Sequence, residues 1–293
     1  MKKHNVQLLL STLLFFVSSF LSAQGVGVGK RISLTNKLNL DVNDGQFAQI
    51  FIPDYFSPSQ DGNFLLVFHL HSASWAAEDE VYKSKTNAVL FNIHLGGFSS
   101  SYKNYFVDQN NFNKILGLIV KELKANNVIE NPIIENLIMT SFSAGYGGVR
   151  EILKTQTYYD MIDALTLADG LHSDLEPDVM KDFLRFAADA RDKKKIMLLT
   201  HSNILTHTYA NTTETADYLI NNINTVRVNY DAVDNIGKQY SRADTGYFHV
   251  KGYRGTTAED HMKHLFNMDK MLKQAVDILS TSTNIEGDRK RHN

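Results

Sequence analysis

The chain has 293 residues, of which 43% are hydrophobic, so it is long enough and apolar enough to bury one large core. It contains no cysteine, which excludes a disulfide framework and a lipid-modified cysteine. The net charge of -2 offers no strongly positive surface for a polyanion, so we expect no nucleic-acid partner.

The first residues have the pattern of a bacterial-type signal peptide. Two lysines precede an apolar run over residues 6–21, and the small residues Ser22 and Ala23 follow it. Cleavage of residues 1–23 would leave a mature chain that begins near Gln24, with no membrane span and with 28 basic against 32 acidic residues. We therefore expect a periplasmic or secreted protein, with an uncleaved membrane anchor as the alternative.

Short apolar runs alternate with amphipathic stretches along the rest of the chain. After a glycine-rich start that we expect to be loose, apolar runs predict strands over residues 48–52, 64–68, 88–93, 137–139, 164–168, 196–199 and 247–250. Apolar residues at helical spacing predict helices over residues 112–123, 179–188 and 262–279. Continuous apolar strands that alternate with helices favour an α/β protein with a doubly wound, mostly parallel sheet flanked by helices. We expect one domain over residues 24–279 and a disordered tail over residues 280–293.

One short segment carries the pattern of a catalytic turn. Residues 141–145 read Ser-Phe-Ser-Ala-Gly. They follow the apolar run 137–139 and Thr140, and they precede an expected helix start that contains two glycines. This resembles the nucleophile turn of the α/β-hydrolase family, G-x-S-x-G between a strand and a helix. The resemblance implies an α/β-hydrolase fold with Ser143 as nucleophile, although Ser141 stands where the family has its first glycine. The alternatives are Ser141 as the nucleophile, or a serine in an ordinary turn of small residues.

The family's chain order places an acid and then a histidine after the serine. Asp169 directly follows the predicted strand 164–168, and the resemblance implies that it is the acid. In many family members the acid follows the next strand, but here that strand ends in Thr-His-Ser-Asn and offers no carboxylate. A turn-forming Asp-Gly pair is the alternative for Asp169. The base is then expected after the last strand, where His261 is the first choice and His264 the second.

The same resemblance suggests where an oxyanion would be held. The backbone N–H of Ala144 would be one donor, at a helix start whose free amides face developing negative charge. The second would come from the loop after an early strand, from Ser72 or Ala73, and Ser72 stands where glycine is usual. We expect His71 to brace this loop and to lie at the substrate. Two aromatic residues complete the expected substrate-facing set, Trp75 and Tyr146.

These residues predict an exported serine hydrolase that cleaves a carboxylic ester, with an acyl group on a carbohydrate as the first guess and a peptide bond as the runner-up. The segment 172–191 is a possible lid insertion that would shape substrate choice. We expect no cofactor and no metal, and the oligomeric state stays open. A metal site at His69, His71 and His94 is one competing interpretation. A non-catalytic carbohydrate- or protein-binding protein of the same fold is another.

Overall fold

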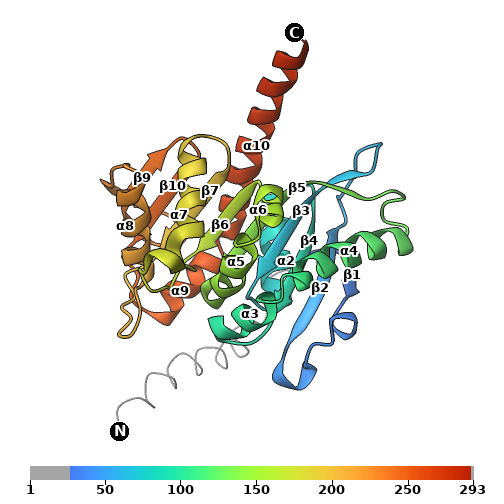
Figure 1. The fold of residues 1–293 in the computed structure, drawn as a ribbon, viewed down its shortest axis with the longest axis horizontal. Helices are drawn as coiled ribbons and strands as arrows, with labels where there is room; N and C mark the ends of the chain where they lie inside the picture. The colour runs from blue at the N-terminus through green and yellow to red at the C-terminus, as the bar shows by residue number, and fades with distance from the viewer. Residues whose placement is uncertain (1–26, 292–293) are drawn as a thin grey trace.

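The computed structural model describes residues 27–291, and the expected signal peptide lies outside this range. A single ten-stranded sheet runs through the molecule in the order β1-β2-β4-β3-β5-β6-β7-β10-β9-β8 (Figure 1). Its strands are β1 (Gly29–Ser33), β2 (Phe47–Pro53), β3 (Asn63–Leu70), β4 (Ala88–His94), β5 (Ile133–Phe142), β6 (Ala164–Ala168), β7 (Ile196–His201), β8 (Val228–Val233), β9 (Lys238–Thr245) and β10 (Phe248–Tyr253).

The central part of the sheet is parallel. Six neighbouring strands, β4, β3, β5, β6, β7 and β10, run in one direction. Antiparallel strands extend both edges, with β2 and β1 on one side and β9 and β8 on the other. The carboxyl ends of the parallel strands therefore meet at one edge of the sheet, which is where side chains from distant parts of the sequence can come together.

Helices cover both faces of the sheet. They are α2 (Ser74–Ser84), α3 (Ser99–Phe106), α4 (Asn110–Ala125), α5 (Tyr146–Leu153), α6 (Gln156–Met161), α7 (Pro177–Arg191), α8 (Thr212–Asn222), α9 (Ala258–Leu265) and α10 (Met268–Arg291). Apolar residues of α3 to α8 pack in one core, whereas those of α2, α9 and α10 pack in a second core on the opposite face. Successive side chains of a strand point to opposite faces of the sheet, so one strand contributes to both cores. On β3, Leu66 and Phe68 lie in the first core and Val67 lies in the second.

The doubly wound, mostly parallel sheet predicted from the sequence is confirmed, and the differences lie at its edges. β1 begins at Gly29, at the end of the stretch expected to be loose, because it pairs with the apolar strand β2. β8 and β9 had no predicted counterpart, since they are polar and mostly exposed on one side and lack a continuous apolar run. The helix predicted over residues 262–279 is divided by Phe266 and Asn267 into α9 and α10.

Two segments that the sequence singled out contain helices. Most of the segment 172–191 forms α7, whose apolar side chains are buried in the first core, and only the short loop 172–176 precedes this helix. Residues 280–291, expected to be a disordered tail, continue α10 as a helix that leaves the body of the protein (Figure 1). Extending an existing helix costs less than starting one, which favours this continuation. Within residues 27–291 no helix is both long and apolar enough to cross a membrane.

Candidate active site

Ser143 lies at the point where β5 passes into a helix. The strand ends at Phe142, Ser143 begins a single 3-10 turn (Ser143–Gly145), and α5 follows directly. The backbone of Ser143 has a φ of 46°, in the left-handed region that L-residues with a side chain seldom adopt. This conformation turns the chain sharply at the carboxyl edge of the sheet and leaves Ser143 partly exposed while its neighbours are buried.

The turn requires a residue without a side chain at position 145. A Cβ built on Gly145 would lie 2.4 Å from the backbone carbonyl oxygen of Leu70, at the end of the neighbouring strand β3. Such a contact is much shorter than van der Waals separation, and a backbone carbonyl within a sheet cannot easily move away. The glycine that this sequence shares with the family motif is therefore explained by the close approach of β3.

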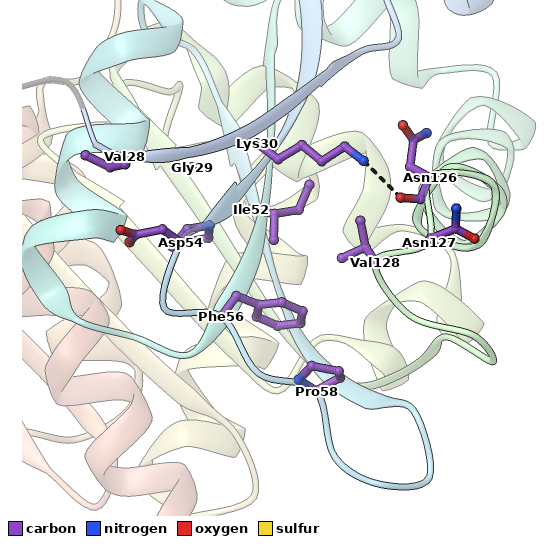
Figure 2. A pocket seen from close by; sticks show the side chains of 11 residues that line it. Val28, Gly29, Lys30, Ile52, Asp54, Phe56, Pro58, Asn126, Asn127 and Val128 are labelled. Atoms are coloured by element: carbon purple, nitrogen blue, oxygen red, sulfur yellow. Dashed lines mark hydrogen bonds between the residues drawn. The ribbon is translucent and has the colours of Figure 1, made fainter.

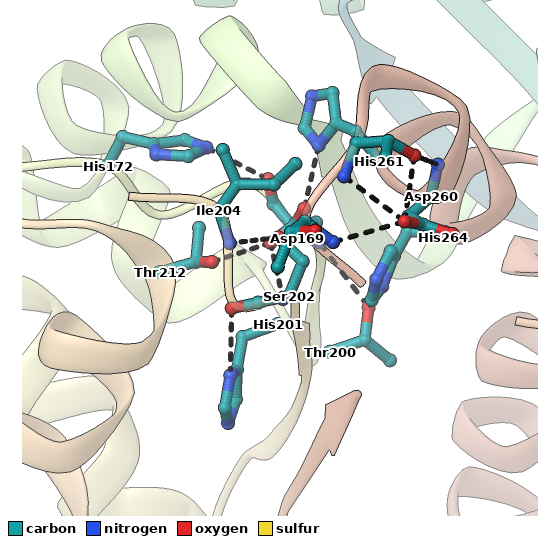
Figure 3. Close-up of polar contacts among 12 residues, drawn as sticks. Asp169, His172, Thr200, His201, Ser202, Ile204, Thr212, Asp260, His261 and His264 are labelled. Atoms are coloured by element: carbon teal, nitrogen blue, oxygen red, sulfur yellow. Dashed lines mark hydrogen bonds and ion pairs between the residues drawn. The ribbon is translucent and has the colours of Figure 1, made fainter. Parts of the chain in front are cut away.

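Asp169 comes directly after β6 and is completely buried. Its backbone is also left-handed, with a φ of 43°, which aspartate tolerates better than most residues. The carboxylate has partners on both oxygens, as Figure 3 shows. The amide of Ser202 donates to Oδ1 at 2.9 Å and Thr212 Oγ1 donates to the same oxygen at 2.5 Å, while Oδ2 lies 2.7 Å from His261 Nδ1.

These contacts keep the carboxyl of Asp169 ionised. Burial alone would raise its pKa, but the charges of His264 and His261, together with the hydrogen bond from His261, hold the pKa well below its usual range. At neutral pH His264 is itself uncharged, because burial lowers its pKa to about 4. The hydrogen bonds to the carboxylate therefore supply the stabilisation near neutrality.

His261 approaches Asp169 from the opposite layer of helices. It lies in the first turns of α9, which a capping box between Thr257 and Asp260 fixes at its start. With Nδ1–H donating to the Asp169 carboxylate, Nε2 carries the lone pair and can accept a proton. The imidazole ring lies 4.5 Å, centroid to centroid, from the ring of Phe142, the residue that immediately precedes Ser143. The three residues predicted as nucleophile, acid and base thus lie at the same edge of the sheet.

His264, the second candidate for the base, has a different environment. It is 1% exposed, and its Nδ1 lies 2.8 Å from Thr200 Oγ1 in β7. Its ring packs edge-on against Tyr253 at 5.4 Å. These contacts give His264 a packing role, whereas His261 has the hydrogen bond to Asp169.

The loop after β3 lies beside the nucleophile turn, as the predicted oxyanion loop should. The amide of His71 donates to the Ile93 carbonyl at 3.1 Å and continues the pairing with β4, so Ser72 is the first residue beyond that pairing. His71 is left-handed with a φ of 76°, and its Nδ1 lies 2.9 Å from the hydroxyl of Tyr102. The chain therefore turns away from the sheet at His71, directly after Leu70, whose carbonyl oxygen lies against Gly145 of the nucleophile turn.

The two aromatic residues expected at the substrate lie on opposite layers. Trp75 stacks on Phe266 with the ring centroids 5.8 Å apart and packs against the core of α2, α9 and α10. Tyr146 begins α5, donates to Ser99 Oγ at 3.1 Å, and lies 6.4 Å, ring to ring, from His172. Tyr146 therefore borders the loops around Ser143, while Trp75 is largely used in packing α2 against the helices that follow the last parallel strand.

The histidines of the competing metal-site interpretation have other partners. His69 Nδ1 lies 2.7 Å from Thr140 Oγ1, and burial lowers the His69 pKa to about 3. The rings of His71 and His94 stack at 5.3 Å, and both histidines lie near the Tyr102 hydroxyl. Across residues 27–291, no group of three histidine, aspartate or glutamate side chains is arranged to hold a metal ion.

Three residues near the site had no signal in the sequence. Ser202 donates to Asp169 through its backbone amide just after β7, and Thr212 donates through its hydroxyl at the start of α8. No local sequence pattern reveals either role. His172 lies close to Asp169 and to His261. Its Nε2 is 3.2 Å from the carbonyl oxygen of Asp169, and its ring centroid is 6.1 Å from that of His261. Burial lowers the pKa of His172 to about 4, so it is neutral near pH 7.

A surface hollow of about 480 Å³ lies away from these residues (Figure 2). It is lined in part by Ile52 and Asp54 at the end of β2 and by residues 126–128 after α4. Because β2 runs antiparallel to the central strands, its end lies at the edge of the sheet opposite to Ser143. The hollow therefore belongs to a different part of the surface from the candidate active site.

No protein-family model matches the sequence, and no curated protein matches it. Among solved structures, the chain is similar to a ferulic acid esterase, with a TM-score of 0.52, 12% sequence identity, and 86% of this chain and 98% of that chain covered. It is also similar to the acylaminoacyl peptidase of Pyrococcus horikoshii, with a TM-score of 0.46, 10% identity, and 89% and 42% of the two chains covered. An uncharacterised protein from Capnocytophaga ochracea gives a TM-score of 0.44, 11% identity, and 82% and 65% coverage. The sheet order and the first of these similarities give the chain an α/β-hydrolase fold, as the sequence predicted.

Proposed function

We propose that this chain is a serine hydrolase that cleaves a carboxylic ester through an acyl-enzyme, with Ser143, His261 and Asp169 as nucleophile, base and acid. The observation that carries the proposal is the 2.7 Å contact between His261 Nδ1 and Asp169 Oδ2, beside a serine in a left-handed turn after a buried strand. An orienting acid, a histidine with a free Nε2 lone pair and a serine at a sharp strand-to-helix turn are the parts that this chemistry needs.

In the first half of the reaction, His261 Nε2 removes the proton from Ser143 Oγ while Oγ forms a bond to the ester carbonyl carbon. Asp169 stabilises the imidazolium that results, because its ionised carboxylate accepts the hydrogen bond from Nδ1. The imidazolium then gives the proton to the oxygen of the leaving alcohol as the carbonyl re-forms. In the second half, a water molecule attacks the acyl carbon while His261 Nε2 takes a proton from it. The imidazolium then returns this proton to Ser143 Oγ as the bond from Oγ to the acyl carbon breaks and the carboxylic acid leaves.

The negative charge of each tetrahedral intermediate falls on the former carbonyl oxygen. The amide of Ala144, at the start of the helix turn, and that of Ser72, where the chain leaves β3, are the donors we assign to it. A fixed amide near such a charge contributes about 3 kcal/mol to lowering the barrier. The backbone turns at Ser143 and His71 hold both segments in place before substrate arrives.

An ester is favoured over an amide on two grounds. The resemblance of the sequence is to the esterase-like members of the fold, and the solved structure with a TM-score of 0.52 is described as a ferulic acid esterase. An acyl group on a carbohydrate is the substrate class we propose, because an exported hydrolase meets extracellular polymers and their fragments. Export itself rests on the pattern of residues 1–23, and the N-terminal sequence of the protein recovered from culture fluid or periplasm tests it.

The decisive experiment is labelling with a fluorophosphonate, which reacts covalently with an activated serine. We expect the native chain to be labelled at Ser143 and the Ser143→Ala and His261→Ala variants to remain unlabelled. Ser141→Ala is the matched control, because this buried serine lies two residues before Ser143, near the end of β5. Labelling that persists in Ser143→Ala, or full ester hydrolysis by that variant, would overturn the proposal.

A panel of substrates then identifies the bond that is cleaved. It consists of 4-nitrophenyl acetate, acetylated xylo-oligosaccharides, methyl esters of hydroxycinnamic acids and peptide 4-nitroanilides. We expect hydrolysis of esters at least 10² times faster than hydrolysis of anilides, as kcat/KM, and we expect Asp169→Asn to lower kcat by about 10³ to 10⁴. Anilides cleaved faster than every ester would point to a peptidase. Absence of both labelling and hydrolysis, with measurable binding of an oligosaccharide, would point to a binding protein.

A further inference from the structure

We propose that Thr212, at the start of α8, is a positioning residue that orients the Asp169 carboxylate toward His261. The inference rests on the proposed function and extends it to a residue outside the predicted triad. Thr212 Oγ1 donates to Asp169 Oδ1 at 2.5 Å, while the other carboxylate oxygen, Oδ2, faces His261 Nδ1 at 2.7 Å. The hydroxyl has a single proton, and this contact uses it.

The contact has little freedom, because both of its ends are buried. Asp169 is completely buried and Thr212 is 2% exposed, so no water competes freely for the hydrogen bond. A hydrogen bond from a neutral hydroxyl to a buried carboxylate is stronger than one between neutral groups, and it is short here as expected. The carboxylate is also held by the amide of Ser202, so its Oδ1 has two fixed donors and Oδ2 is left for His261.

The helix that carries Thr212 is fixed independently of Asp169. Asn211, the N-cap of α8, accepts from the amides of Thr213 and Glu214 at 3.0 Å each, and Glu214 Oε2 accepts from the Asn211 amide at 2.8 Å. This reciprocal capping box sets the position of the first residue of the helix, which is Thr212. The partial positive charge at a helix N-terminus also favours the ionised form of a nearby carboxylate.

A second hydrogen bond ties the same helix to the loop that contains the acid. Thr215 Oγ1 donates to the carbonyl oxygen of Leu171 at 2.6 Å, two residues after Asp169. The loop is thus attached to α8 at its carboxylate and at its backbone. This arrangement follows from the position of the acid: because the carboxylate comes after β6, the connection after β7 is free to supply donors to it, through Ser202 and Thr212.

The test compares two substitutions that separate the hydroxyl of Thr212 from its methyl group. Thr212→Val keeps the branched shape and removes the donor, whereas Thr212→Ser keeps the donor and removes a methyl group. For 4-nitrophenyl acetate we expect Thr212→Val to lower kcat about 10- to 100-fold with KM changed less than about 3-fold, a loss typical of residues that orient a catalytic group. We expect Thr212→Ser to stay within about 3-fold of the native kcat. Thr212→Ala replaces Thr212→Val if the valine variant does not fold.

Thr213→Val is the matched control on the same helix turn. Its hydroxyl lies 2.9 Å from His201 Nδ1 and donates to the Ser202 carbonyl at 2.8 Å, without touching the Asp169 carboxylate. We expect this variant to keep kcat within about 3-fold of the native value even if its melting temperature falls. Equal losses of kcat in Thr213→Val and Thr212→Val would mean that the effect is structural, and the proposal would fail.

A double-mutant cycle shows whether Thr212 acts through Asp169. In the Asp169→Asn background, Thr212→Val should lower kcat less than about 2-fold further, because the carboxylate that it positions is already absent. The same 10- to 100-fold loss in both backgrounds would contradict the proposal, and so would an undiminished kcat in Thr212→Val alone. The proposed function fails separately, if Ser143→Ala or Asp169→Asn keeps the native kcat.

Discussion

Gly145 and Ser141 share one small space inside the turn around Ser143. A Cβ built at position 145 would lie 2.7 Å from Ser141 Oγ, closer than any unstrained contact. The serine that stands in place of the family's first glycine is therefore accommodated because the second glycine is kept. Ser141 is completely buried, and its hydroxyl has no hydrogen-bond partner within residues 27–291.

The first prediction concerns this hydroxyl. Ser141→Ala removes a buried polar atom that the described part of the protein does not satisfy, so we expect the free energy of unfolding to rise by about 1 kcal/mol. Ester hydrolysis should stay within about 3-fold of the native rate, in contrast to Ser143→Ala. Urea unfolding at equilibrium and steady-state kinetics measure the two effects. A large loss of activity with stability unchanged would show that Ser141 has a chemical role.

The second prediction concerns Gly145. Gly145→Ala places a methyl group against the Leu70 carbonyl oxygen, so the turn must shift, and we expect a loss of about 1–3 kcal/mol in stability and a large fall in kcat. Gly117→Ala is the matched control, because a Cβ there meets nothing within 4 Å on the exposed side of α4. The control should gain about 1 kcal/mol from the better helix propensity of alanine. Native activity in Gly145→Ala would mean that the turn tolerates the displacement.

The third prediction separates the two histidines of α9. His261→Gln should lower kcat at least 10³-fold, because it removes the imidazole that is hydrogen-bonded to Asp169 and that we assign as the base. His264→Gln should keep kcat within about 10-fold and mainly lower the melting temperature, since His264 contacts Thr200 and packs on Tyr253. Kinetics and thermal unfolding of both variants test this, and the opposite pattern would assign the base to His264.

The fourth prediction concerns the dependence of stability on pH. Burial lowers the pKa of His69 and His201 to about 3 and that of His172 and His264 to about 4, below the ordinary value of 6.5. Between about pH 6.5 and pH 4 the unfolded chain binds protons at these positions and the folded chain does not. Stability should therefore fall as the pH is lowered through this range, by about 1.4 kcal/mol per pH unit for each proton.

Protonation of Asp169 should lower the stability further, at a lower pH than protonation of the histidines. Its pKa in the folded chain lies well below 3.8, so its contribution to stability is present above that value and is lost as the pH falls further. Urea unfolding at pH 7.0, 6.0 and 5.0 measures the dependence due to the histidines. His264→Gln removes one of the four and should make the slope shallower, whereas a slope near zero in the native protein would show that these histidines are protonated in the folded state.

The sequence was most informative where a local pattern determines the structure. The apolar run before Ser143, the small residues around it and the helix start after it are all neighbours in the chain, so their pattern predicted the turn that β5 and α5 form. The position of Asp169 could also be predicted, because this residue directly follows a short apolar strand in the sequence. The fold class followed from the alternation of such runs, and the structure confirms it.

Other features depend on contacts between distant segments and left no local pattern. His261 and His264 are three residues apart and of the same type, and only the hydrogen bonds of their Nδ1 atoms distinguish them. Thr212 lies 43 residues from the acid to which it donates, in a sequence context shared by many helix starts. The strands β8 and β9 are polar enough to resemble loops, and they are strands because each pairs with a neighbour at the edge of the sheet.

The two layers of helices determine when, during synthesis or export, Ser143, Asp169 and His261 can come together. Ser143 leads into α5 on one face of the sheet, and His261 lies on α9 on the other, 92 residues after Asp169. A chain that leaves the ribosome or crosses a membrane with its N-terminus first would expose the serine and the aspartate long before the histidine. If the proposed triad is the catalytic one, such a chain would hydrolyse no ester until nearly all of it has emerged and the last layer of helices has packed.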